Sequence, residues 1–116
     1  MKPLMEHYLE CALWSSTGED DRPLDSDFGI CDIDAETVTK MQEDVDAFVE
    51  MNTDLLNASG LSEEQIGHDF WLTRNRHGAG FWDRGLGDIG RKLSEASKVY
   101  GEASLYVGDD GKIHVM

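Results

Sequence analysis

The 116-residue sequence is short of positive charge, with 10 Lys and Arg against 24 Asp and Glu and a formal net charge of −14. A chain this acidic is repelled by nucleic-acid phosphates and by anionic membrane surfaces, so direct binding to either is excluded. The sequence also has no apolar run of the length that a signal peptide or a transmembrane span requires. These absences leave a cytoplasmic enzyme, a module that binds a basic protein surface, or an oligomeric structural protein.

Cysteine is scarce as well: the sequence has two, Cys11 and Cys31, and no CxxC pair. We interpret them as reduced thiols of a cytoplasmic protein, with Cys11 as a small core residue. The four histidines lack the spacing of zinc ligands, and the aspartates at 25, 27, 32 and 34 lack the register of a calcium loop. The motifs GxGxxG, HExxH and GxSxG and the P-loop are absent too. We therefore expect neither a metal nor a cofactor.

The length and a hydrophobic content of 40% predict one globular domain, residues 1–116. Apolar residues recur at helical spacing in three stretches, which predicts main helices over residues 3–15, 35–57 and 86–100. Trp14 is expected on the apolar side of the first helix, and Asp34 or Asp32 is expected to cap the second. A shorter helix begins at residue 63, after a capping box formed by Ser62 and Gln65.

β-Structure is predicted at two places. Residues 69–74 and 79–84 have the pattern of a hairpin around a turn at 75–78, and the alternative is a helix that continues through residue 74. Residues 105–107 and 113–115 have the pattern of a terminal hairpin whose inward side chains are Leu105, Val107, Ile113 and Val115. The predicted fold is therefore α+β, a small antiparallel sheet of two hairpins packed against three main helices.

The negative charge is concentrated in residues 1–60, which carry 15 acidic and 3 basic residues, whereas residues 61–116 carry 9 and 7. Helical spacing places four carboxylates in one row on the outer side of the second helix: Glu43, Asp46, Glu50 and Asp54. The preceding loop adds Glu19, Asp20, Asp21, Asp25 and Asp27. Such a surface predicts salt-sensitive association with a basic protein surface. The alternative interpretation is an ordinary solvated helix face.

Residues 67–85, GHDFWLTRNRHGAGFWDRG, hold most of the side chains that could perform chemistry. A histidine could act as a general base oriented by a carboxylate, a set made of His68, His77, Asp69 and Asp83. A tryptophan could stack a base while arginines hold its phosphates, a set made of Trp71, Trp82, Arg74, Arg76 and Arg84. The alternative is structural, with the aromatic rings in the core and the arginines paired with the protein's own acids.

The same segment, with YLECALWSS near the start and GEASLYVGDDGKIHV near the end, resembles a family of small uncharacterised proteins. These proteins are widespread in bacteriophages and other mobile elements, and the resemblance covers most of residues 8–115. The family usually has glycine where this chain has Arg76, and a glycine there would permit a turn with positive φ. The resemblance implies a phage or mobile-element origin and transfers no catalytic residue.

Together these observations favour a phage or mobile-element protein that binds and inhibits a host protein in the host cytoplasm, as an anti-CRISPR or anti-restriction inhibitor does. The basic partner surface would contact Asp20, Asp21 and Asp25 in addition to the row on the second helix. A first alternative is a small hydrolase or ligand-binding protein with its site formed by His68, Arg74, His77 and Arg84. A second is a homo-oligomer with an aromatic interface. Binding is expected rather than catalysis.

Overall fold

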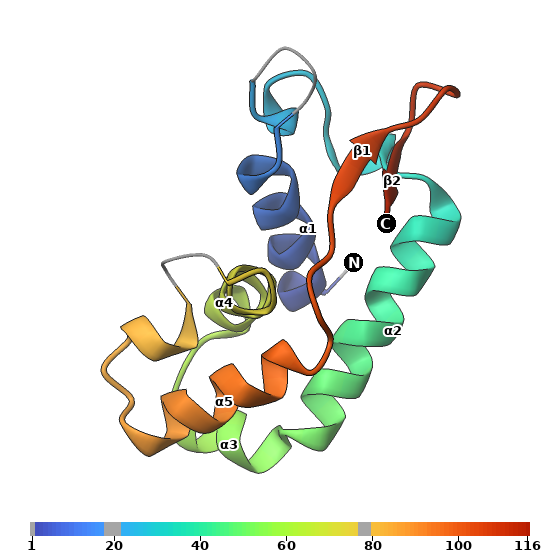
Figure 1. The fold of residues 1–116 in the computed structure, drawn as a ribbon. Helices are drawn as coiled ribbons and strands as arrows, with labels where there is room; N and C mark the ends of the chain where they lie inside the picture. The colour runs from blue at the N-terminus through green and yellow to red at the C-terminus, as the bar shows by residue number, and fades with distance from the viewer. Residues whose placement is uncertain (1, 18–21, 77–79) are drawn as a thin grey trace.

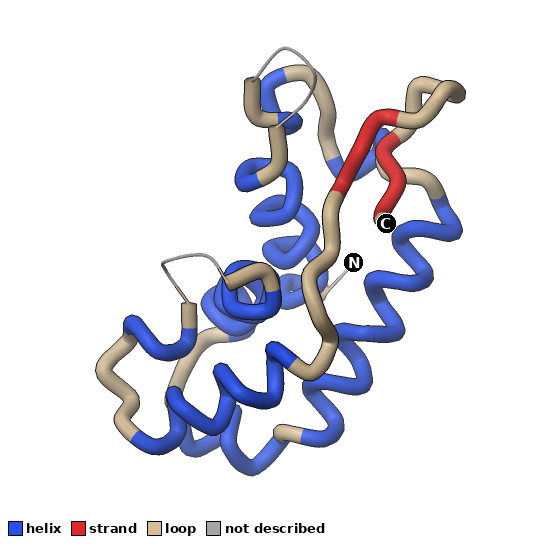
Figure 2. The backbone as a smooth tube through the Cα atoms, viewed as in Figure 1, coloured by secondary structure: helices blue, strands red, loops and turns tan. Residues whose placement is uncertain are grey.

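Five α-helices and one two-stranded antiparallel sheet form the fold in the residues that the computed structural model describes, 2–17, 22–76 and 80–116 (Figures 1 and 2). This confirms the α+β class, with helix as the dominant element. Among these residues, no helix combines the length and the apolar character needed to cross a membrane. In chain order the elements are α1 (Pro3–Ser15), η1 (Leu24–Ser26), η2 (Ile30–Asp32), α2 (Ala35–Met51), α3 (Thr53–Ser59), α4 (Glu63–Arg74), η3 (Phe81–Asp83), α5 (Asp88–Lys98), β1 (Leu105–Val107) and β2 (Ile113–Val115).

Helices α1 and α4 pack against each other, and Gly67 allows their close approach (Figure 1). A Cβ atom at position 67 would lie 2.1 Å from the backbone carbonyl oxygen of Leu4 on α1. No side-chain carbon can sit that close to a backbone oxygen, so any other residue would push the two helices apart. Gly67 is therefore an interior residue of α4 and does not end the helix.

The predicted hairpin of residues 69–74 and 79–84 is wrong, and the alternative, a helix through residue 74, is confirmed. Residues 69–74 form the second half of α4, and residues 81–83 form the 3-10 turn η3. All six residues of that half-helix are buried, so their apolar side chains show no 3.6-residue period. A short continuous apolar run of this kind has the same sequence pattern as a buried strand. Residues 77 and 78 of the predicted turn lie outside the described residues.

The starts of three helices follow their local signals. Helix α1 has the predicted bounds, with Pro3 in its first turn. Helix α2 begins after Asp34, whose Oδ2 accepts a hydrogen bond from the Glu36 N–H at 3.1 Å. Helix α4 begins with the predicted capping box, in which the Ser62 hydroxyl accepts from the Gln65 N–H at 3.2 Å and the Gln65 Oε1 accepts from the Ser62 N–H at 3.0 Å. These interactions connect residues that are close in sequence, which explains why the sequence predicts them.

Three local predictions are wrong. The helix expected over 35–57 divides at Asn52, whose side-chain amide donates to the Phe48 carbonyl oxygen at 2.8 Å and competes with the helical ladder. The terminal hairpin forms in the predicted place, but Val107 is 42% exposed because β1 runs away from the helices toward its turn (Figure 1). Trp14 is 58% exposed, on the outward side of α1.

Four aromatic rings from both halves of the chain form the centre of the core. Phe48 of α2 stacks on Phe70 of α4, with ring centroids 4.1 Å apart and an interplanar angle of 8°. The ring centroid of Tyr8 lies 5.3 Å from that of Phe70, and the centroid of Phe81 lies 5.8 Å from that of Phe48. All four residues have an exposed fraction of 0%. The acidic first half and the aromatic second half therefore share one hydrophobic core.

The two cysteines are free thiols in different environments, which gives a test of the packing of α1. Cys11 is buried in the core, and burial raises the pKa of its thiol to about 12, whereas Cys31 is exposed. We expect a thiol-alkylating reagent at neutral pH to modify one cysteine per folded chain and both per unfolded chain, because the thiolate is the reactive form. Mass spectrometry of the quenched samples measures the result. The Cys31→Ser variant should stay unmodified while folded, and alkylation of Cys11 in that variant would contradict the packing.

Arg76 has φ 59°, a left-handed backbone conformation that glycine adopts without strain. We expect Arg76→Gly to raise the free energy of unfolding by up to about 1 kcal/mol, because this conformation costs an L-residue about 1–2 kcal/mol and the added chain entropy of glycine cancels part of the gain. Urea denaturation measures the change. The matched control, Arg91→Gly inside α5, should lower stability by about 1 kcal/mol. A loss of stability in Arg76→Gly would contradict the strain.

Candidate functional site

The guanidinium of Arg74, at the end of α4, is buried and donates hydrogen bonds to four acceptors. Its Nη1 donates to the Tyr8 hydroxyl at 3.0 Å and to Asp44 Oδ2 at 2.9 Å. Its Nε and Nη2 donate to the backbone carbonyl oxygens of Gly101 and Tyr100, each at 2.9 Å. Arg74 therefore connects α4 to α1, to α2 and to the segment that follows α5. The interpretation that an arginine of residues 67–85 pairs with the acidic half of the chain is confirmed for this residue.

Burial and pairing fix the charge states around Arg74. Burial raises the pKa of the Tyr8 hydroxyl to about 12, so the hydroxyl stays neutral. Burial by itself lowers the pKa of Arg74, but the contacts with Tyr8 and Asp44 outweigh it and leave the pKa above its ordinary value. Arg74 is thus a permanent cation enclosed by the protein's own acceptors, and this is a structural role rather than a ligand-binding one.

The predicted pair of His68 and Asp69 is brought together, but Arg84 holds the carboxylate. His68 Nδ1 lies 3.4 Å from Asp69 Oδ1. Arg84 donates from Nε and Nη2 to the two oxygens of Asp69, at 2.6 and 3.0 Å, and the Asp69 side chain is 2% exposed. Arg84 itself is exposed, so the pair lies at the surface side of the buried Asp69 and gives that carboxylate a bidentate partner. This ion pair ties the segment after η3 to α4.

The other residues predicted in 67–85 separate into core and surface. Trp71 is 2% exposed, while Trp82 is 54% exposed. Asp83 is exposed on η3, and His77 lies outside the described residues. The described aromatic and arginine side chains of this segment thus serve mainly to build the core and its ion pairs.

The four predicted carboxylates are all exposed: Glu43, Asp46 and Glu50 lie at helical spacing on α2, and Asp54 lies on α3, beyond the break at Asn52. Among the described residues none of the four forms an ion pair with a basic side chain, and Asp46 accepts a hydrogen bond from the neutral Gln42 amide at 2.8 Å. Glu50 stands in the last turn of α2, where the helix dipole disfavours an acidic side chain and no basic residue compensates it. We call these four residues the acidic row.

The loop acids do not extend the acidic row. Asp25 and Asp27 are exposed in and beside η1, and Asp27 forms an ion pair with Arg22 at 2.6 Å. Figure 1 shows η1 beside the C-terminal end of α1, at the opposite end of the molecule from the C-terminal end of α2. Asp25 and Asp27 therefore lie away from the end of the acidic row that Glu50 and Asp54 form. Glu19, Asp20 and Asp21 lie outside the described residues.

A groove that the sequence did not reveal runs along α2 and α3 beside the acidic row. It consists of two hollows of about 230 and 300 Å³ that share Leu4, Val49 and Glu63. Its apolar lining residues are Leu4, Met5, Val45, Val49, Leu56, Leu61 and Ile66, and the side chains of Gln42, Thr53 and Asn57 add polar groups to the lining. Its rim carries the carboxylates of Asp46, Glu50 and Glu63, with Lys2 at one end. The sequence indicates the groove only weakly, through apolar residues such as Leu4 and Val49 at the edges of the helical apolar stripes, and the structure shows these residues to be half-buried.

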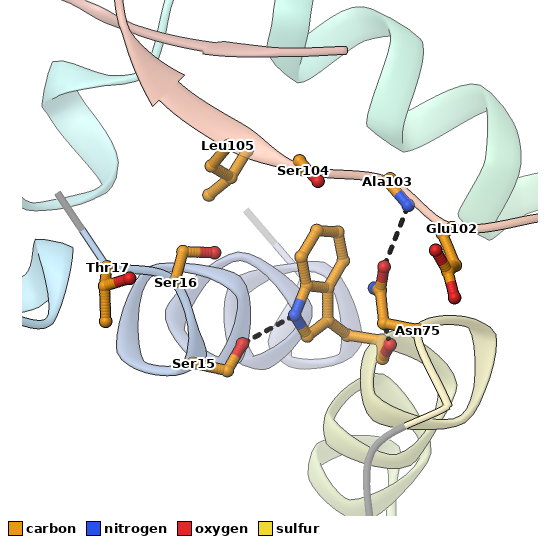
Figure 3. Close-up of a pocket in the computed structure, with 9 residues that line it drawn as sticks. Ser15, Ser16, Thr17, Asn75, Glu102, Ala103, Ser104 and Leu105 are labelled. Carbon is orange, nitrogen blue, oxygen red and sulfur yellow. Dashed lines mark hydrogen bonds between the residues drawn. The ribbon is translucent and has the colours of Figure 1, made fainter. Parts of the chain in front are cut away.

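A polar hollow of about 390 Å³ lies next to Trp71, between α1, α4 and the segment before β1 (Figure 3). The Trp71 Nε1 donates to the Ser15 hydroxyl at 2.7 Å, and Asn75 Oδ1 accepts from the Ala103 N–H at 2.8 Å. These bonds join the three segments around the hollow. The indole N–H of Trp71 and the side-chain oxygen of Asn75 therefore already have partners within the protein, and these side chains serve to hold the three segments together.

The described residues that come nearest to a metal site are Asp34, Asp110 and His114, whose ligand atoms lie within 4.8 Å of one another. His114 Nε2 lies 3.0 Å from Asp110 Oδ1, and its Nδ1 lies 4.0 Å from Asp34 Oδ2. A hydrogen bond from His114, with another from the Lys112 N–H, lowers the pKa of Asp110. Asp34 also caps α2. The backbone joins the terminal hairpin to the start of α2, because the Asp34 N–H donates to the Ile113 carbonyl oxygen at 2.8 Å, and the cluster lies beside this contact.

Comparisons of this chain with models of known protein families, with curated proteins and with solved structures find no match. Among the described residues, the acidic row and the groove beside it form an exposed surface in which the carboxylates of the row have no basic partner from the chain.

The enclosed guanidinium of Arg74 should contribute strongly to the free energy of unfolding. We expect Arg74→Lys to lower the free energy of unfolding by about 2–4 kcal/mol, because a lysine keeps the charge but cannot reach four acceptors with a planar fork. Chemical denaturation of both proteins measures the difference. Arg91→Lys, on the exposed side of α5, is the matched control and should change stability by less than about 0.5 kcal/mol. Equal small effects in the two variants would show that the hydrogen bonds of Arg74 do not hold the fold together.

Proposed function

We propose that this protein binds a basic surface of another protein through the acidic row. The observation that supports the proposal is the contrast between its carboxylates and those of Asp44 and Asp69. Asp44 and Asp69 are paired with arginines of the same chain, whereas the members of the row are exposed and lack a basic partner among the described residues. A row of like charges left unneutralised is suited to a cationic partner.

The energetics of the free protein support the same proposal. Like charges three or four residues apart on a helix destabilise it by about 0.2–0.5 kcal/mol per pair. The position of Glu50 in the last turn of α2 adds an unfavourable interaction with the helix dipole. A basic partner relieves both, so part of the binding free energy comes from strain that the free protein already carries.

In the setting that the family resemblance implies, the partner is a host protein. The basic groove of a nucleic-acid-handling defence protein, built to attract phosphates, also attracts a rigid array of carboxylates. We propose that the protein occupies such a surface and thereby inhibits the host factor.

The experiment is affinity capture from host lysate at low salt, followed by affinity measurements with the purified partner. We expect the triple variant Glu43→Gln, Asp46→Asn, Glu50→Gln to weaken binding by at least about tenfold, because each charge of an interface contributes about 0.2–1 kcal/mol or more. Raising the ionic strength from about 0.1 M to about 1 M should also weaken binding, since the Debye length falls from about 10 to about 3 Å.

A second triple variant with the same net charge is the control: Asp88→Asn, Glu95→Gln, Asp109→Asn, three exposed acids outside the acidic row. It should retain most of the affinity. If both triple variants weaken binding equally, net charge and not the acidic row drives association. If no specific protein is captured from the host lysate at low salt, the proposed function fails.

A further inference from the structure

The groove beside the acidic row has an apolar interior that the fold leaves open. Its deeper residues Met5, Val45, Leu56 and Ile66 are buried, while Leu4, Val49 and Leu61 are only partly covered. A partly covered apolar wall gains free energy when another apolar side chain removes it from water, at about 25 cal/mol per Å². The groove therefore favours an occupant with apolar side chains of its own.

The backbone around the groove restricts the conformation of that occupant. The lining residues belong to α1, α2, α3 and α4, to the residue before α1 and to the loop between α3 and α4. Helical walls have their backbone groups bonded within each helix, so an extended peptide finds no strand edge there to pair with. A helical occupant satisfies its own backbone and needs only side-chain contacts.

The length of the groove suits a short helix. On α2 the groove is lined by Gln42, Val45, Asp46, Val49 and Glu50, a side about 12 Å long at 1.5 Å per residue. After the break at Asn52 the lining continues for about one turn on α3, at Thr53, Leu56 and Asn57. An amphipathic helix of about three turns presents anchors at i, i+3 or i+4, i+7 and i+11, which suit such a lining.

The charged residues at the rim of the groove indicate the charge of the molecule that it binds. Asp46, Glu50 and Glu63 border the apolar floor, and Lys2 is the one basic residue among the lining residues. Three carboxylates against one ammonium favour cationic side chains on both flanks of an apolar stripe. Lys and Arg are suited to that position, because their stems cover apolar surface while their charged ends reach the rim.

We propose that the groove binds a basic amphipathic helix of the partner protein, with the apolar stripe of that helix on Leu4, Val49 and Leu61 and its lysines or arginines at Asp46, Glu50 and Glu63. The inference rests on the proposed function, since it names the part of the partner that this face holds. Asp46 and Glu50 belong to both surfaces, so the acidic row continues the rim and contacts the basic residues beyond the stripe.

The test uses a synthetic helical peptide of 16 residues as probe, with leucines at the four anchor positions and lysines on both flanks, and measures its affinity for the full chain by fluorescence anisotropy. A control peptide has the same composition with the leucines distributed around the helix. We expect the amphipathic peptide to bind at least about tenfold more tightly, because only it presents one apolar stripe to the groove.

Two matched variants locate the site. Val49→Lys places an ammonium and its stem in the groove, whereas Met51→Lys adds the same charge at an exposed position of α2, 81% exposed in the wild type. We expect Val49→Lys to weaken peptide binding by at least about tenfold and Met51→Lys by less than about threefold, the size of a single exposed charge. Glu63→Gln, in the rim but outside the acidic row, should weaken binding about two- to fivefold. Circular dichroism and thermal melting verify that each variant is folded.

The outcomes separate this inference from the proposed function. If Val49→Lys and Met51→Lys bind the peptide alike, or if the scrambled peptide binds equally well, the groove is not the site, whether or not the acidic row binds a host protein. If the variants of the acidic row retain partner affinity while Val49→Lys loses it, the proposed function fails and the groove alone binds the partner. A concentration-dependent dimer in sedimentation that Val49→Lys disrupts and Met51→Lys does not would make a second copy the occupant and would overturn the inference.

Discussion

The fold depends on one enclosed cation. The Arg74 guanidinium is held by the Tyr8 hydroxyl, by Asp44 and by two backbone carbonyls after α5. A planar group with five donors in fixed directions suits four acceptors from three separate segments, and a point charge would not. The same residue ties α4 to α1, to α2 and to the end of α5. Removing any acceptor leaves a buried charge less satisfied, so the mutual orientation of these helices is specific.

This constraint decides which side of α2 is available to a partner. Phe48 and Asp44, four residues apart and therefore on one side of the helix, contact the aromatic core and Arg74. The side that remains carries the acidic row, and Val49 on the neighbouring side lines the groove. The acidic row and the groove thus lie next to each other on the part of α2 that the side of Asp44 and Phe48 leaves open. A partner that is both basic and amphipathic matches this pair of surfaces.

Residues 67–85 show how chemistry-rich side chains can serve the fold instead. Trp71 contributes its ring to the core and its N–H to Ser15, and Arg84 neutralises the buried Asp69. A small domain has few residues with which to fill its interior, so large aromatic rings must do so, and their burial brings polar groups that need partners. The arginines supply those partners. Aromatic and charged residues therefore occur together in this segment because polar groups that are buried with the aromatic rings need hydrogen-bond or ion-pair partners.

The sequence by itself determined the features that depend on neighbouring residues: the Asp34 cap, the Ser62–Gln65 capping box, the terminal hairpin and the helical spacing of Glu43, Asp46 and Glu50 on α2. Only the tertiary structure decided that α4 continues to Arg74, that this residue meets Asp44, and that a groove opens beside Val49. Each of these depends on contacts between segments far apart in the chain, such as the close approach of Gly67 to α1, and uniform burial removes the periodicity that a sequence pattern needs.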